Sequence, residues 1–181
     1  MKSKVEPGDA GGDAAAVIAR LGLVPHPKEG GYFRETYRAG EALAEGALAA
    51  RYGGGRAVAT AIYYLLTPAA FSAPHRLASD EIFHFYAGDP VEQLRLYPAG
   101  QGEVVVLGAD LAAGMRPQAV VPRGVWQGAR LRAAGRYALL GCTVAPGFDY
   151  ADYEAGERRA LAASHPRYAD WIAALTPGPE Q

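Results

Sequence analysis

A histidine and a glutamate separated by a short turn, His75 and Glu81, are the residues of this sequence best suited to chemistry. The apolar run that follows the turn predicts a strand that ends at Gly88. Alternation along a strand places Glu81, Phe83 and Phe85 on one face. A carboxylate beside two phenylalanines is costly to bury unless it is paired or hydrogen-bonded, so Glu81 is a functional candidate. The simpler alternative is a glutamate at a strand end that reaches water.

The opposite face of the same strand is also largely apolar, because it carries Ile82, His84 and Tyr86. Something is therefore expected to cover it, either a terminal helix or a second subunit, and we expect a homodimer. His84 is read first as a structural histidine and second as a substrate-binding residue of the pocket.

A second stretch with clear alternation follows the turn at Pro122 to Gly124. Gln127 is the single polar residue on a face that it shares with Val125, Ala129 and Leu131. A buried amide needs hydrogen-bond partners, so a polar group inside the fold must meet it. Gln127, Phe83 and Phe85 are accordingly candidates for contact with a small-molecule ligand.

The elements that must position these residues are mostly strands. An alternating stretch covers residues 32–38, and short apolar runs bounded by Gly, Pro and Asp cover 57–66, 81–87, 91–97, 103–107, 118–121, 125–132 and 136–145. Because no helical segment separates these runs, they predict an antiparallel sandwich or barrel.

Helices are expected only around this β region. Asp13 is a candidate N-cap for a helix over 14–21, residues 42–50 could form one or two helical turns, and Asp152 and Pro166 are placed to begin two C-terminal segments. Pro177 is expected to end the last one. The organisation predicted is a disordered tail over 1–12, one domain over 13–176 and a second tail over 177–181.

Composition excludes several classes of protein. The formal net charge is −1 and the basic residues are scattered, so no nucleic-acid partner is expected. No apolar stretch approaches the roughly 20 residues of a membrane span. The N-terminal residues lack the apolar segment of a signal peptide, and the lone Cys142 is interpreted as a buried core residue. A cytoplasmic protein is expected.

The two stretches together resemble the two motifs of the cupin superfamily. His75, Glu81 and Gly88 match the first motif, and Pro122-Arg123-Gly124 followed by Gln127 matches the second. Longer phrases, PHPKEGGYFRETYR, TAIYYLL, HRLASDEIFHFYAGDPVE, VPRGVWQGARL and GCTVAPGFDYADYE, are similar to the fifth cupin group, from about Leu21 to Leu175. The resemblance implies an all-β double-stranded β-helix (a jelly-roll barrel) with short N- and C-terminal helices, and no settled activity.

The departures from the family pattern concern the metal ligands. A typical metal cupin uses three histidines and a glutamate, but Leu77 and Gln127 stand at two of the histidine positions. Only His75 and Glu81 remain as strong ligands. No cofactor is expected, and His75, Glu81 and Gln127 would hold a divalent ion only weakly.

The group also looks similar to deoxysugar epimerases, which use a cupin barrel without metal. That similarity implies a metal-independent epimerase or isomerase acting on a sugar-like or hydroxylated compound. His75 would be the base and Glu81 would orient it or share its proton. Tyr63 or Tyr64 would be the acid, and the sequence does not decide which of them faces inward.

Arg34 and Arg76 are candidates to neutralise a phosphate or carboxylate of the substrate. Two alternatives stay open. One is a binding module without chemistry, anchored by His75 and Glu81. The other is a metal-dependent dioxygenase or isomerase with His75, Glu81 and Gln127 as ligands.

Overall fold

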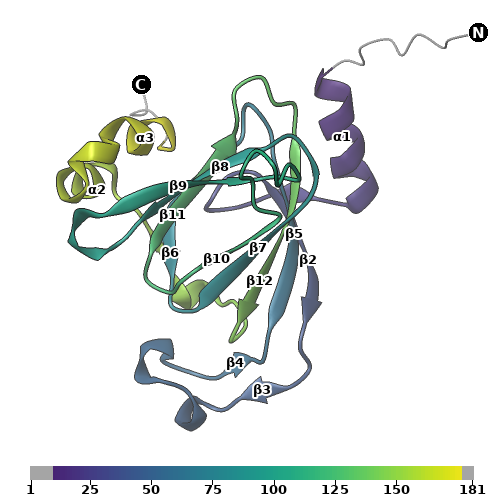
Figure 1. Ribbon diagram of the computed structural model, residues 1–181. Helices are drawn as coiled ribbons and strands as arrows, with labels where there is room; N and C mark the ends of the chain where they lie inside the picture. Colours follow the sequence, from purple (N-terminus) through teal and green to yellow (C-terminus); the bar gives the residue numbers. More distant parts are fainter. Residues whose placement is uncertain (1–9, 177–181) are drawn as a thin grey trace, which may run out of the picture.

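The computed structural model describes residues 10–176 of the chain (Figure 1). Residues 1–9 of the tail predicted over 1–12, the tail predicted over 177–181 and the helix end expected at Pro177 lie outside the described residues. Residues 10–12 of the predicted tail belong instead to the first helix. Within residues 10–176, no helix has both the length and the hydropathy that crossing a lipid bilayer requires.

Two antiparallel sheets form the body of the fold. The six-stranded sheet has the order β1 (Val24–Pro25), β2 (Tyr32–Arg38), β5 (Thr60–Leu66), β12 (Ala138–Ala145), β7 (Asp80–Gly88) and β10 (Gln118–Val121). The five-stranded sheet has the order β13 (Tyr153–Ala155), β6 (Ser72–Leu77), β11 (Trp126–Leu131), β8 (Val91–Leu96) and β9 (Gly102–Leu107). A short hairpin of β3 (Ala42–Leu43) and β4 (Arg56–Ala57) extends away from both (Figure 1).

The main hydrophobic core lies between the two sheets. Alternate side chains of each strand point inward, among them Tyr64 of β5, Phe83 of β7, Ala129 of β11 and Leu140 of β12. Strands that follow one another in the chain are often on opposite sheets, as β6 and β7 are. This exchange between sheets is the jelly-roll arrangement, so the all-β fold expected from the sequence is confirmed.

The C-terminal helices cover the outer face of the five-stranded sheet. Leu94 and Leu96 of β8 pack there against Leu161 of α2 (Arg158–Ser164) and Ile172 of α3 (Ala169–Ala174) (Figure 1). A 3-10 turn, η5 (Pro166–Tyr168), joins the two helices, so Pro166 stands at a helical start as expected. The N-cap of α2 is Glu157, whose carboxylate accepts the N–H groups of the first turn. Asp152 instead ends a separate 3-10 turn, η4 (Tyr150–Asp152).

Two expected elements differ in detail, and one strand of the structure was not expected. Helix α1 runs over Ala10–Leu21, so Asp13 lies within its first turn rather than at its N-cap, and Asp13 pairs with Arg136 at 2.9 Å. Residues 42–50 give β3 and a 3-10 turn, η1 (Glu45–Ala47), and a further turn, η2 (Ala50–Tyr52), follows. Strand β6 is absent from the predicted runs because its inward positions include Ser72 and His75 rather than a run of apolar residues.

Candidate active site

A cavity of about 310 Å³ opens at one end of the space between the sheets. Its wall combines carboxyl groups with aromatic rings. The lining residues are His26, Glu29, Phe33, Glu35, Arg38, Thr60, Ile62, Glu81, Cys142, Val144, Phe148, Asp149 and Tyr150. Of these, Glu81 is the one that the sequence motif singles out.

The turn between β1 and β2 brings Glu29 into the cavity. His26 Nδ1 accepts the backbone N–H groups of Lys28 at 3.3 Å and Glu29 at 2.9 Å, which fixes the turn from inside. Gly30 and Gly31 follow with φ of 86° and 71°, a conformation that favours glycine. The Tyr64 hydroxyl donates to the Gly30 carbonyl at 2.9 Å and supports the turn from below.

His75 lies behind the carboxyl groups of Glu29 and Glu81. Its Nδ1 is 2.8 Å from the carbonyl oxygen of Ala73, to which it donates, so Nε2 carries the lone pair of the neutral ring. This Nε2 is 3.8 Å from Glu29 Oε1 and 4.0 Å from Glu81 Oε2. The side chains of Glu29 and Glu81 are 12% and 10% exposed, against 2% for His75. A ligand therefore meets the carboxyl groups first.

A chain of amides holds Glu81 from the barrel interior. Gln127 Nε2 donates to Glu81 Oε2 at 2.6 Å, while Gln127 Oε1 faces Gln93 Nε2 at 3.5 Å. Arg95 donates from Nε and Nη2 to Gln93 Oε1 at 3.0 and 2.7 Å. Because a guanidinium has only donors, it turns the Gln93 oxygen toward itself and the nitrogen toward Gln127. This series of hydrogen bonds therefore ends with the Gln127 amide donating to Glu81.

Burial shifts the pKa values of this group so that the uncharged form of each side chain is favoured. It raises the pKa of Glu29 to about 8 and, together with the nearby Glu29 carboxyl, that of Glu81 to about 7. Burial lowers the pKa of His75 below its ordinary value. It lowers the pKa of His26 to about 4, with smaller contributions from His75 and Lys28. Near neutral pH, Glu29 holds a proton, Glu81 exchanges one and both imidazoles are neutral.

Several predicted residues do face the interior. His75, Glu81 and Gln127 meet there, and Gln127 pairs directly opposite His75 across β11 and β6. Phe83 lies in the core beneath the cavity, and Phe85 is partly buried against the same core. The buried amide thus has the partner that the sequence requires.

Tyr63, Arg34 and His84 lie on the outer face of the six-stranded sheet. The Arg34 guanidinium is 5.8 Å from the centre of the Tyr63 ring, and this ring meets that of Tyr86 edge-on at 6.1 Å. His84 Nε2 is 3.1 Å from Thr143 Oγ1 on the same face. None of the three lines the cavity, so the structure places Tyr64, not Tyr63, on the inner side.

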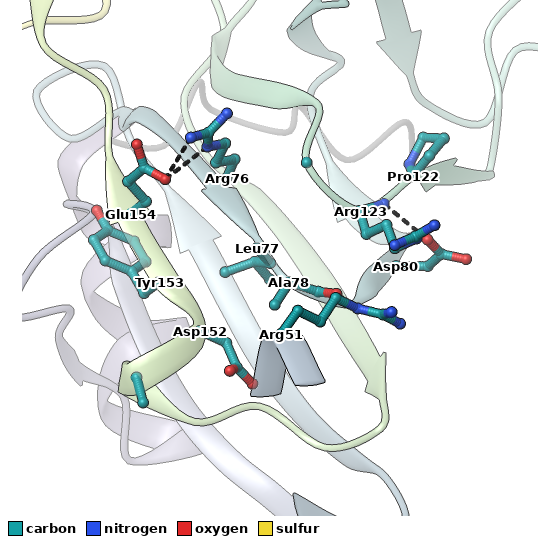
Figure 2. A pocket seen from close by; sticks show the side chains of 12 residues that line it. Arg51, Arg76, Leu77, Ala78, Asp80, Pro122, Arg123, Asp152, Tyr153 and Glu154 are labelled. Carbon is teal, nitrogen blue, oxygen red and sulfur yellow. Dashed lines mark hydrogen bonds and ion pairs between the residues drawn. The ribbon is translucent and has the colours of Figure 1, made fainter. Parts of the chain in front are cut away.

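Arg76 lines a separate groove of about 760 Å³ on the outside of the barrel (Figure 2). Its guanidinium pairs with Glu154 at 2.7 Å, and the backbone N–H of Arg123 donates to Asp80 at 2.8 Å. Tyr153 borders this groove and stacks on His75 at 5.4 Å. The groove therefore lies beyond the wall of the cavity and does not share its carboxyl groups.

His26 and Glu29 are the residues that sequence reasoning misses. Both belong to the phrase PHPKEGGYFRETYR, which carries part of the family resemblance. The available signal is a His and a Glu within the four residues before two glycines and an alternating strand. This pattern is typical of a turn that places polar side chains at the end of a sheet.

This arrangement defines the class of protein: a cupin barrel with a polar pocket between its two sheets. The chain belongs to the family described as Cupin superfamily (DUF985), whose model matches residues 15–156, and the expected resemblance is confirmed. The uncharacterized protein YML079W of Saccharomyces cerevisiae is 32% identical over 140 residues, which cover 72% of this chain and 69% of that protein.

Two solved structures share the fold over nearly their whole length. Protein SO0799 from Shewanella oneidensis is 34% identical, with a TM-score of 0.81, and the match covers 92% of this chain and 98% of that one. A hypothetical protein from Leishmania major is 33% identical, with a TM-score of 0.80, covering 91% of this chain and 99% of that one. These relatives establish the fold and the family.

The side chains do not fit the ligand set of a metal cupin. Gln127 turns its amide nitrogen, not its oxygen, toward Glu81, and Leu77 stands at a second ligand position. His26 Nδ1 is occupied by two backbone N–H groups. Within residues 10–176, no group of three or more His, Cys, Asp or Glu side chains is arranged to hold a metal ion.

Proposed function

We propose that the barrel cavity is the active site of a metal-independent epimerase or isomerase, which moves a proton on a small hydroxylated carbonyl compound. The observation that carries this proposal is the placement of two buried carboxyl groups, Glu29 and Glu81, within 4.0 Å of one imidazole nitrogen, His75 Nε2. Groups that exchange protons near neutral pH are what acid–base catalysis requires.

The three groups have distinct roles in the proposal. The Glu81 carboxylate takes a proton from the carbon next to the substrate carbonyl, breaking the C–H bond and forming an O–H bond. The electron pair passes into the carbonyl, whose oxygen takes the proton of Glu29. His75 Nε2 is the base that receives the proton from Glu81. For an isomer, Glu81 takes its proton back from His75 and gives it to the former carbonyl carbon, while the Glu29 carboxylate takes the proton of the hydroxyl on the neighbouring carbon, where the new carbonyl forms. For an epimer, a water molecule gives a proton to the other face of the carbon, Glu29 takes back the enol proton, and the hydroxide left takes the proton of His75.

Gln127 and Tyr64 support these groups rather than touching the substrate. Gln127 holds Oε2 of Glu81, a residue that lines the cavity. The Tyr64 hydroxyl is committed to the Gly30 carbonyl, and burial raises its pKa well above the ordinary value. Tyr64 is therefore a positioning residue for the Glu29 turn, and Glu29 takes the part of the acid.

Deuterium exchange tests the reaction without knowledge of the product. The protein is incubated in D₂O with a panel of neutral aldoses and ketoses, and loss of the C–H signal next to the carbonyl is followed by ¹H NMR. We expect exchange with at least one compound, and we expect His75→Ala to slow it by about 100-fold. His84→Ala, on the outer face, is the matched control and should retain the wild-type rate.

Two results would contradict the proposal. Binding without exchange in every case assigns the cavity to a non-catalytic binding module. Exchange that depends on added Fe, Mn, Ni or Zn assigns the chemistry to a metal-dependent cupin.

We further propose that the chain acts as a homodimer in the cytoplasm. The support for the dimer is the outer face of the six-stranded sheet, where Tyr86 and Val120 are 52% and 46% exposed beside the half-buried Ile82. The C-terminal helices cover the outer face of the five-stranded sheet. A second copy of this chain would cover the outer face of the six-stranded sheet in the same way.

A further inference from the structure

The wall of the cavity is poor in available positive charge. Among the described residues that line it, Arg38 is the only arginine or lysine. Its acidic residues are Glu29, Glu35, Glu81 and Asp149. Sites for phosphates and carboxylates supply arginine, lysine or several free backbone N–H groups, because an anion needs charge-assisted donors when it leaves water.

The positive charge of Arg38 is already matched. Its Nε and Nη2 donate to the two carboxylate oxygens of Glu35 at 3.0 and 2.7 Å, and its Nη atoms also reach the Phe148 carbonyl at 3.3 Å. The Arg38 and Glu35 side chains are 46% and 40% exposed, so an incoming phosphate or carboxylate would compete with Glu35 for the guanidinium.

Arg34 and Arg76 lie outside the cavity, and Lys28 lies over the ring of Tyr150, one of the lining residues. Arg34 lies on the outer sheet face over Tyr63, and Arg76 pairs with Glu154 in the external groove (Figure 2). Lys28 Nζ lies 4.8 Å from the centre of the Tyr150 ring, outside the lining residues. The anion-binding role that the sequence suggests for Arg34 and Arg76 therefore has no support from their positions.

Aromatic rings, carboxyl groups and small or aliphatic side chains supply the remaining surface. The rings of Phe148 and Tyr150 meet edge-on at 5.0 Å, and Phe33 lies across the cavity wall beside His26 at 4.6 Å. Ring faces pack against the C–H faces of a sugar, while Glu29 and Glu81 can accept or donate hydrogen bonds to its hydroxyls. At about 310 Å³ the cavity is at the lower end of ligand pockets, too small to enclose a nucleotide sugar.

We propose that the ligand of this cavity is an uncharged polyhydroxylated compound of monosaccharide size, without a phosphate, nucleotide or carboxylate group. This inference depends on the proposed proton transfer in one respect, which is that the substrate contains a carbonyl group. Its lack of charge follows from the lining residues, because Arg38 and Glu35 neutralise each other and Glu29 holds a proton near neutral pH. Its size follows from the volume of the cavity. The proposed ligand therefore differs from the phosphate- or carboxylate-bearing substrate for which the sequence suggests Arg34 and Arg76.

Paired ligands test the charge directly. Neutral hexoses and pentoses are each compared with their 6- or 5-phosphate, their sugar acid and their amino sugar, by saturation-transfer NMR and then titration. We expect at least one neutral sugar to bind, with its phosphate and acid weaker by about tenfold or more. Tighter binding of the phosphate, the acid or the amino sugar overturns the inference, and so does a lack of binding by every neutral sugar.

Two matched variants test the mechanism of exclusion. Glu35→Gln releases Arg38 at the cavity wall, while Glu154→Gln releases Arg76 in the external groove. We expect Glu35→Gln to raise the affinity for the phosphate relative to the neutral sugar by about tenfold, because a free guanidinium then faces the ligand. Glu154→Gln should leave this ratio unchanged. Equal effects of the two variants overturn the argument from Arg38.

The binding assay separates this inference from the proposed reaction. A neutral sugar that binds but exchanges no deuterium contradicts the proton transfer and leaves the ligand class standing. Deuterium exchange seen only with a phosphorylated or acidic sugar supports the reaction and overturns the ligand class.

Discussion

The ionisation of Glu29 affects the stability of the folded state near neutral pH. Its pKa rises to about 8 through burial, whereas an unfolded chain would give about 4.5. The folded protein therefore binds this proton more tightly than the unfolded chain. The stability that results is present below pH 4.5 and is lost as the pH rises toward 8.

The variant Glu29→Gln tests this dependence, because glutamine keeps the shape and cannot ionise. We expect its free energy of unfolding at pH 9 to exceed that of the wild type by about 5 kcal/mol, with little difference at pH 4. Urea denaturation at the two pH values measures both. Glu154→Gln, at an exposed glutamate, is the control and should show no such divergence. A constant difference between Glu29→Gln and wild type at both pH values would show that Glu29 ionises normally.

Burial and the Glu29 carboxyl raise the pKa of Glu81, and the hydrogen bond from Gln127 opposes that rise. Gln127→Met keeps the length of the side chain and removes the donor at 2.6 Å. Because this bond favours the carboxylate, we expect the pKa of Glu81 to rise above about 7. The alkaline shift is measured from the carboxyl ¹³C signal of labelled Glu81. Gln118→Met on the outer sheet face is the control, and an equal shift in both variants contradicts the role of Gln127.

The sequence predicts part of this site and misses part of it for a physical reason. His75, Glu81 and Gln127 stand on strands, where period-two alternation and motif spacing show which side chains share a face. His26 and Glu29 stand on a turn, where no period applies. The choice between Tyr63 and Tyr64 stayed open because both faces of β5 are apolar, one toward the core and one toward the outer sheet surface.

At the scale of elements, the turn between β1 and β2 is the piece that the site depends on. Gly30 has φ of 86°, and a Cβ atom there would overlap the carbonyl oxygen of Phe71. We expect Gly30→Ala to lower the free energy of unfolding by about 3 kcal/mol, because it adds a steric overlap to an unfavourable backbone conformation. It should also weaken ligand binding, since the turn carries Glu29.

Gly53→Ala is the matched control for this substitution. Gly53 also has a positive φ, 59°, but a Cβ atom there would meet nothing within 4 Å. Its cost should be about 1 kcal/mol, from the backbone alone. Chemical denaturation of both variants gives the comparison, and similar losses would mean that the contact with Phe71 relaxes freely.

Elements with a strong period are those that the sequence predicts well. The expected strands over 32–38 and 118–121 coincide with β2 and β10. β6 is missed because Ser72 and His75 break its apolar pattern, and these two residues are buried polar groups of the interior. α2 begins at a different residue from the expected one, because Glu157 caps its first turn with two hydrogen bonds.

At the scale of the whole molecule, the two sheets are covered unequally. The five-stranded sheet has a second hydrophobic cluster on its outer side, built with the C-terminal helices. The six-stranded sheet leaves Tyr86 and Val120 exposed. An apolar sheet face of this kind is costly to leave in water and is typical of an interface.

The substitution Val120→Lys tests whether a second copy covers this face. Light scattering after size exclusion should give twice 19.1 kDa for the wild type at micromolar concentration. We expect Val120→Lys to give the monomer mass, because each subunit would bring an unpaired charge to an apolar contact. Leu111→Lys is the control, since Leu111 is 68% exposed in the loop between β9 and β10 and should leave the dimer intact. A wild-type protein that runs as a monomer contradicts the dimer, and Ile82 and Tyr86 would then face solvent in the working protein.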